Sequence, residues 1–152
     1  MLHASLLTEP VTILLVEDNP AHAELIMRSL ADHQIVNRIV HLRDGEAALD
    51  YLFHRGAYAD PLAHPRPHVI LLDLRLPRLD GLEVLQAIKT SDNVGTIPIV
   101  ILSTSGAESD VATAYALHAN SYMIKPDDFA EFTRLLHDLG FYWLFWNYYP
   151  YS

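Results

Sequence analysis

The sequence contains no cysteine, which excludes disulfide bonds, thiolate nucleophiles and zinc sites built from thiolates. Positive charge is also scarce, because ten Lys and Arg residues stand against nineteen Asp and Glu residues, a formal net charge of -9. Affinity for nucleic acid depends largely on cationic contacts with phosphates. We therefore expect no nucleic-acid partner.

Long hydrophobic runs are missing as well. The longest, residues 69–72 and 97–102, are much shorter than the ~18 apolar residues that a membrane-spanning helix needs. The first ten residues lack the charged and apolar regions of a signal peptide. With 51% hydrophobic and 19% charged residues, the 152-residue chain has the composition of one globular domain. We expect it to be cytoplasmic, without a membrane partner.

Short apolar runs alternate with segments of helical periodicity five times along the chain. This alternation predicts a single α/β domain in which a parallel sheet carries helices on both faces. Asp44 is expected to cap the second helix, and Gly140 to end the last one. The expected strands are 12–16, 36–42, 69–72, 97–102 and 122–124, and the other expected helices are 21–30, 81–89, 108–117 and 127–139.

Two segments lie outside this alternation. Residues 54–67 include one Gly and three Pro without periodicity, so we expect a long surface loop there. Residues 141–152 are rich in aromatic side chains, with eight in twelve positions. The chain therefore divides into an N-terminal segment (1–10), one domain (11–140) and an aromatic C-terminal extension (141–152).

Five polar side chains follow the expected strands directly. Glu17 and Asp18 follow the first strand, Asp73 the third, Ser103 the fourth and Lys125 the fifth. Ligands of open parallel sheets bind beyond the carboxyl ends of the strands. These five side chains are therefore expected to meet in one crevice.

Their chemistry suits phosphoryl transfer. Three carboxylates in one crevice would repel each other unless a cation neutralised them, and hard oxygen ligands suit Mg²⁺. A carboxylate nucleophile such as Asp73 can form an acyl phosphate, whose other oxygens a lysine and a hydroxyl would hold. Taken singly, each residue is more simply explained as a turn former, a capping group, a surface lysine or a core hydroxyl. The five in this order favour a functional site.

The motifs around these residues resemble the receiver domains of bacterial two-component response regulators, over roughly residues 11–139. The resemblance implies a flavodoxin-like, doubly wound five-stranded parallel sheet of order 2-1-3-4-5. The matching motifs are Leu15-Val16-Glu17-Asp18-Asn19-Pro20, Leu71-Leu72-Asp73-Leu74-Arg75-Leu76-Pro77, Asp80-Gly81, Leu102-Ser103 and Lys125-Pro126.

The resemblance also implies a role for each site residue. Asp73 is the phosphoacceptor, which takes its phosphoryl group from a histidine kinase. Mg²⁺ is held by Glu17, Asp18, Asp73 and the backbone carbonyl of Arg75. A receiver of this kind assists its own phosphorylation and dephosphorylation but is not a conventional enzyme.

The resemblance also implies residues that change position when the domain is phosphorylated, which together form a switch. Ser103 is the hydroxyl that moves toward the phosphoryl group, and Lys125 is its cationic partner. Tyr122 occupies the aromatic switch position, although an aromatic residue in a short strand is more often simple packing. Pro126 resembles a family proline that a cis peptide bond often precedes.

A subgroup resemblance adds a partner and an assembly. The long loop 54–67, Arg43-Asp44-Gly45-Glu46, Leu49-Asp50-Tyr51-Leu52 and Tyr142-Trp143-Leu144 are similar to the small stand-alone response regulators that partner bacterial phytochromes. This implies a phytochrome kinase as partner and a homodimer formed through the C-terminal region. The alternative is that the extension folds back onto its own last helix. The expected interface residues are Phe141, Tyr142, Trp143, Leu144, Phe145 and Trp146.

Two other functions compete with the phosphoreceiver. A pseudo-receiver that only scaffolds a complex would not need all five site residues. A phosphatase with Asp73 as nucleophile would place a second acid two residues on, where this chain has Arg75. The nine histidines are scattered, and prolines separate His64 from His68, so we expect ordinary surface histidines and no metal site there.

Overall fold

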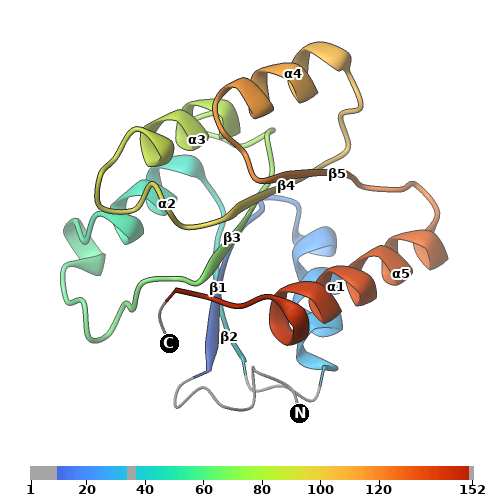
Figure 1. Cartoon of the computed structure of the whole chain (residues 1–152), viewed down its shortest axis with the longest axis horizontal. Coiled ribbons are helices and arrows are strands. Elements are labelled where there is room, and N and C mark those ends of the chain that lie inside the picture. Colours follow the sequence, from blue (N-terminus) through green and yellow to red (C-terminus); the bar gives the residue numbers. More distant parts are fainter. Residues whose placement is uncertain (1–9, 34–36, 151–152) are drawn as a thin grey trace.

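The computed structural model describes residues 10–33 and 37–150. Five parallel strands form one sheet in the order β2-β1-β3-β4-β5 (Figure 1), which confirms the expected flavodoxin-like topology. The strands are β1 (Val11–Val16), β2 (Asn37–Leu42), β3 (Val69–Leu72), β4 (Ile99–Ser103) and β5 (Ser121–Ile124), and the α-helices are α1 (Pro20–Ala31), α2 (Gly45–Leu52), α3 (Gly81–Lys89), α4 (Glu108–Ala116) and α5 (Phe129–Gly140).

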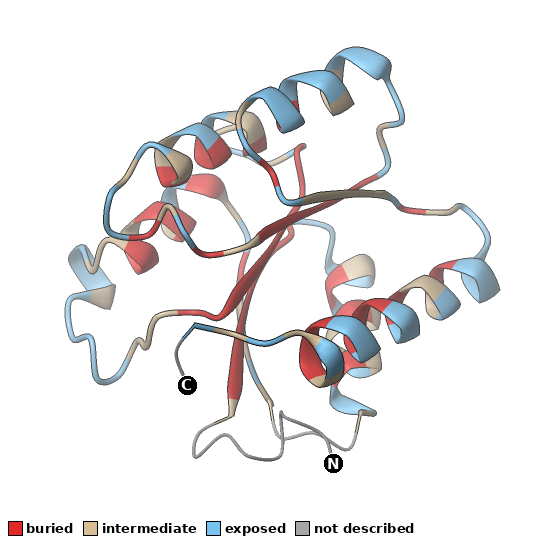
Figure 2. Cartoon of the chain, in the orientation of Figure 1, coloured by how far each residue is buried: buried red, intermediate tan, exposed pale blue. Residues whose placement is uncertain are grey.

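Helices cover both faces of the sheet, with α1 and α5 on one face and α2, α3 and α4 on the other (Figure 1). Successive residues of a strand point to opposite faces. In β1, Leu14 and Val16 therefore join one core cluster while Ile13 and Leu15 join the other. Strands β1 and β3 are buried along their whole length (Figure 2), as expected of parallel strands that helices cover on both sides.

Side-chain N-caps start the two helices, α1 and α3, that follow the expected site residues of β1 and β3. The side chain of Asn19 accepts hydrogen bonds from two backbone N–H groups in the first turn of α1. Asp80 caps α3 by accepting one hydrogen bond, from the N–H of Leu82. Gly81 follows it at a very close approach, because a Cβ there would lie 2.3 Å from the carbonyl oxygen of Asp73. The start of α3 is thus packed directly against the loop that carries Asp73.

Most expected element bounds are confirmed within one or two residues, and β3 and α3 agree fully. Strand β4 begins at Ile99, two residues later than expected, because Pro98 has no N–H to give to the sheet. The expected start of the second strand at residue 36 lies outside the described residues.

Gly140 is the last residue of α5, as expected, but it does not stop the helical course of the chain. Gly140 has φ of -63°, and the chain continues into a π-helical turn, η3 (Phe141–Trp146). A glycine is needed at this position for a different reason, because a Cβ would clash with Nε2 of His33 at 2.2 Å. Gly140 therefore allows the end of α5 to pack closely against the end of α1.

The aromatic extension folds back onto its own domain. Trp143 and Leu144 are 8% and 0% exposed and belong to the core cluster beneath α1 and α5. Tyr149 donates a hydrogen bond to the carbonyl of Trp143 and packs its ring on His68, which directly precedes β3. The extension thus crosses the amino ends of the strands. The expectation of an exposed interface is corrected for Trp143 and Leu144, whereas Phe141, Tyr142 and Trp146 remain exposed.

The segment 54–67 is a surface segment, but it has more structure than expected. It includes a short 3₁₀-helix, η2 (Gly56–Tyr58), and the hydroxyl of Tyr51 donates to the carbonyl of Pro65 at 2.8 Å. The rings of Tyr51, Tyr58 and His64 pack edge to face with centroids no more than 5.7 Å apart. Within the described ranges, no helix has the length and apolar character needed to cross a membrane.

Candidate functional site

The carboxyl ends of β1, β3 and β5 bring a buried lysine between two carboxylates. Nζ of Lys125 lies 2.5 Å from Oε1 of Glu17 and 3.1 Å from Oδ2 of Asp73. All three side chains are buried. Because a buried charge is costly unless it is paired and hydrogen-bonded, these contacts hold the lysine in one place.

A third carboxylate completes an acidic cluster. Glu17, Asp18 and Asp73 each place one carboxylate oxygen within 4.8 Å of the others, and Asp18 is exposed. Three carboxylates and one ammonium leave a net charge of -2 when all are ionised. This is the only such group of three or more potential metal-ligating side chains in the described part of the chain. Oxygen donors at this spacing fit Mg²⁺ or a similar divalent cation.

The electrostatics of Glu17 reflect this crowding. Burial raises the pKa of Glu17 to about 7, and the hydrogen bond from Lys125 opposes that rise. The nearby negative charge of Asp73 raises the pKa of Glu17 further. The site therefore favours any additional positive charge.

The structure adds a residue that the sequence did not single out. His22, in the first turn of α1, places Nδ1 3.0 Å from Nζ of Lys125. Its ring also packs edge-on against Phe132 of α5, with centroids 5.6 Å apart. Burial, and then the charge of Lys125, lower the pKa of His22, which keeps Nδ1 available as an acceptor. The sequence offered one indication that His22 belongs to the site, namely its position at the start of the helix that follows Glu17 and Asp18.

Ser103, whose carbonyl accepts a hydrogen bond from the N–H of Lys125 at 2.7 Å, shares one partner with Tyr122. Ser103 is fully buried, and its Oγ accepts a hydrogen bond from the backbone N–H of Ser105 at 3.2 Å. The hydroxyl of Tyr122 donates to the carbonyl of Ser105 at 2.8 Å. Burial raises the pKa of the Tyr122 hydroxyl, so it remains a donor. The two expected switch residues are therefore connected through Ser105.

The backbone of Arg75 contacts Asp73, whereas its side chain points to a different partner. Its N–H donates to Oδ1 of Asp73 at 3.2 Å, whereas its guanidinium pairs with Asp110 of α4. A role for its carbonyl in metal binding stays a prediction. The described residues contain no cis peptide bond, so the bond before Pro126 is trans.

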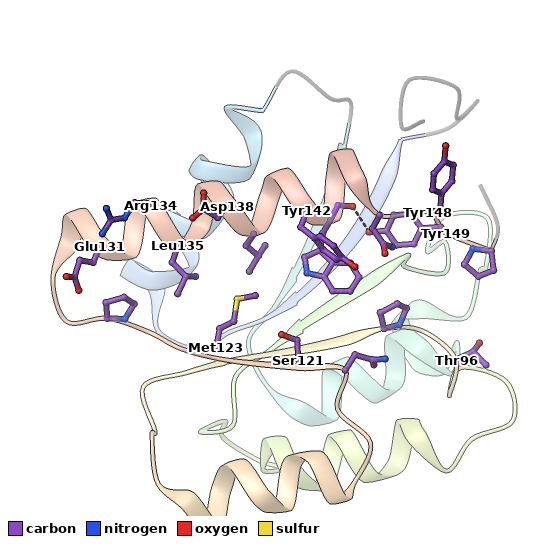
Figure 3. A pocket seen from close by; sticks show the side chains of 17 residues that line it. Thr96, Ser121, Met123, Glu131, Arg134, Leu135, Asp138, Tyr142, Tyr148 and Tyr149 are labelled. Carbon is purple, nitrogen blue, oxygen red and sulfur yellow. Dashed lines mark hydrogen bonds between the residues drawn. The ribbon is translucent and has the colours of Figure 1, made fainter. Parts of the chain in front are cut away.

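Other features lie away from this cluster. His68 is buried and accepts a hydrogen bond from the N–H of Thr12, so the expectation of surface histidines is wrong for this residue. A groove of about 1100 Å³ runs between α5, β5 and the C-terminal extension (Figure 3). Its lining includes Met123, Leu135 and Tyr149 but none of the acidic cluster.

Comparison with known proteins gives a consistent result. The family profile described as the response regulator receiver domain matches residues 13–137. The probable methanogenesis regulatory protein FilR2 of Methanothrix harundinacea (strain 6Ac) is 49% identical over 140 residues, which cover 91% of this chain and 87% of FilR2. The response regulator Rcp1 of Synechocystis sp. (strain ATCC 27184 / PCC 6803 / Kazusa) is 40% identical over 135 residues, 89% of this chain and 90% of Rcp1.

Solved structures agree with the sequence comparison. The phosphorylated cyanobacterial phytochrome response regulator RcpA superposes with a TM-score of 0.89 at 39% identity, covering 93% of this chain and 99% of RcpA. The Mn²⁺-bound form of Rcp1 gives the same TM-score, identity and coverage.

Proposed function

The chain belongs to the response regulator receiver domain family of two-component signalling, and we propose that it accepts a phosphoryl group on Asp73 from a sensor histidine kinase. In this role it is a phosphoacceptor that assists its own modification, not a conventional enzyme. The position of Lys125 between Glu17 and Asp73 supports the proposal most directly. Removing this charge from water is costly, and phosphoryl transfer makes use of it, whereas a scaffold has no chemical use for it.

The proposed reaction is a direct transfer. A carboxylate oxygen of Asp73 forms a bond to phosphorus while the P–N bond of the donor phosphohistidine breaks, and its electron pair returns to the imidazole. The ammonium of Lys125, 3.1 Å from Oδ2 of Asp73, stabilises negative charge that develops on the transferred group. Ser103 and Tyr122 would respond to the new phosphoryl oxygens, as the family resemblance implies.

Glu17, Asp18 and Asp73 would hold Mg²⁺, which neutralises the carboxylates and the phosphoryl oxygens when it is bound. The Mn²⁺-bound form of Rcp1 supports a divalent cation in this family. Titration of Mg²⁺ into wild type and Asp18→Ala checks the ligand set. Equal affinity for both proteins would remove Asp18 from it.

Phosphorylation is tested with acetyl phosphate and Mg²⁺, followed by intact-protein mass spectrometry. The wild type should gain one phosphoryl group, and Asp73→Asn should gain none. Asp127→Asn is a matched control, because it removes an exposed aspartate beyond the end of β5. Stoichiometric labelling of Asp73→Asn would contradict the assignment of the acceptor.

We further propose that the donor is a bacterial phytochrome with histidine kinase activity. The similarity to RcpA and Rcp1 supports this partner. FilR2, which carries a methanogenesis name, offers the competing possibility of a kinase that does not sense light. Label transfer from a purified phytochrome kinase and from a kinase without a phytochrome module distinguishes the two. Faster transfer from the second kinase would reject the phytochrome partner.

A homodimer and a cytoplasmic location complete the proposal. Phe141, Tyr142 and Trp146 are 40%, 52% and 64% exposed and form the free side of η3, which supports pairing through this surface. Replacing Trp146 with Glu should weaken a dimer without touching the buried Trp143. Sedimentation of wild type and variant measures this effect, and a wild type that is monomeric at all concentrations excludes the dimer. Cell fractionation checks the location.

A further inference from the structure

A chain of hydrogen bonds connects the loop after β3 with the strand β5. Nη2 of Arg75 donates to Oδ2 of Asp110 at 2.7 Å, and the same oxygen accepts from Oγ of Ser105 at 2.5 Å. Ser105 in turn donates its N–H to Oγ of Ser103 and accepts from the hydroxyl of Tyr122. Ser105 therefore contacts both residues of the proposed switch, and Asp110 holds Ser105.

The position of Asp110 allows it to hold Arg75 and Ser105 in place. It lies in the first turn of α4, and its side chain is 16% exposed while that of Arg75 is 58% exposed. Its pair with Arg75 is the only ion pair that links the loop after β3 to α4 in the described ranges. The carboxylate of Asp110 thus joins three segments: the loop that carries Asp73, the loop after β4, and α4.

Arg75 also has a potential second partner. It lies two residues after Asp73, and its N–H already donates to Oδ1 of that side chain. A guanidinium matches phosphate oxygens in a planar, bidentate geometry. A phosphoryl group on Asp73 would therefore compete with Asp110 for Arg75.

We propose that Asp110 is a positioning residue that, together with Arg75, holds Ser105 and Tyr122 in the arrangement observed here and thereby opposes phosphorylation of Asp73. This inference rests on the proposed function. Movement of Ser103 toward a phosphoryl group displaces Ser105, which then loses its contact with Asp110 or carries α4 along. By linkage, whatever weakens the contact at Asp110 favours the phosphorylated arrangement.

Beryllofluoride with Mg²⁺, a phosphoryl mimic, measures the first consequence. Asp110→Ala should bind it about fivefold more tightly than wild type, the upper range expected for a partly exposed ion pair. Glu108→Ala is the matched control, because it removes an exposed carboxylate from the same turn of α4. It should bind like wild type. Equal or weaker binding by Asp110→Ala overturns the proposal.

A spectroscopic signal in the free protein separates positioning from simple stability. With 3-fluorotyrosine incorporated and the Tyr122 resonance assigned through Tyr122→Phe, Asp110→Ala should shift that resonance toward its position in beryllofluoride-bound wild type. Glu108→Ala should not shift it. An unshifted Tyr122 resonance in Asp110→Ala rejects the proposal.

Two further measurements cover the cases in which Asp110→Ala does not fold or wild type does not bind beryllofluoride. If Asp110→Ala does not fold, Asp110→Asn preserves the size of the side chain and its contact with Ser105 while removing the charge. It should shift both measurements in the same direction by a smaller factor, and wild-type values in both would reject the ionic restraint. If wild type itself does not bind beryllofluoride, the proposed function fails, whereas the resonance of Tyr122 in the free variants still tests the restraint.

Discussion

Replacement of Leu144 by Ala tests whether the C-terminal extension is part of the core. Leu144 is 0% exposed and packs in the cluster beneath α1 and α5, although it lies beyond the end of α5. A buried Leu→Ala change costs about 2–5 kcal/mol, from lost burial and from the cavity left behind. For a domain that has about 5–15 kcal/mol of stability, this is a substantial loss.

Urea unfolding followed by far-ultraviolet circular dichroism measures the effect. A cost of about 3 kcal/mol with an m-value of about 2 kcal/mol per molar urea lowers the midpoint by about 1.5 M. Leu62→Ala is the matched control, because it makes the same change at a side chain that is 91% exposed. Its effect should remain within about 0.5 kcal/mol.

The comparison of the two variants can refute the folded-back extension. Equal small effects would show that Leu144 is not packed in the core. A large effect whose size depends on protein concentration would show that the extension is buried only in a dimer. Truncation after Gly140 is a poor test of dimerisation, since it also removes the buried Trp143 and Leu144.

Three other predictions concern ionisable groups. Because burial raises the pKa of Glu17 to about 7 from 4.5, the folded protein binds more protons than the unfolded chain between those values. Its unfolding free energy in EDTA should fall as the pH rises through that window, and urea titrations of Glu17→Gln should show a smaller slope. Burial, and then the charge of His137, lower the pKa of His33, so thermal stability should decrease as the pH falls below 6.5, less so in His33→Gln. Lys125→Met should increase Mg²⁺ affinity in calorimetry yet slow phosphorylation by acetyl phosphate, and unchanged Mg²⁺ affinity would contradict the charge balance described here.

The order and type of the elements were predictable because they depend on local sequence. Continuous apolar runs such as Val69–Leu72 need cover on both faces, which requires a parallel sheet between helices. The polar residues that end those runs must then share one edge of the sheet. Glu17, Asp73 and Lys125 meet for this reason, over separations of up to 108 residues.

The arrangement of side chains around that edge was decided only by tertiary packing. The rotation of α1 against α5 brings His22 onto Lys125, and the placement of α4 brings Asp110 between Arg75 and Ser105. Periodicity shows which face of a helix is apolar, but not which polar side chain reaches across to another element.

The course of the backbone after α5 was likewise decided by tertiary packing. In the sequence alone, Gly140 before an aromatic run favours a helix stop and an exposed tail. In the folded chain its missing side chain makes room for His33, and the helix continues until Trp143 and Leu144 are buried. A glycine is compatible with both outcomes, and the neighbour that distinguishes them lies more than a hundred residues away in sequence. The sequence thus determined the sheet and the acidic edge, whereas contacts between distant elements determined the partners of Lys125 and the course of the extension.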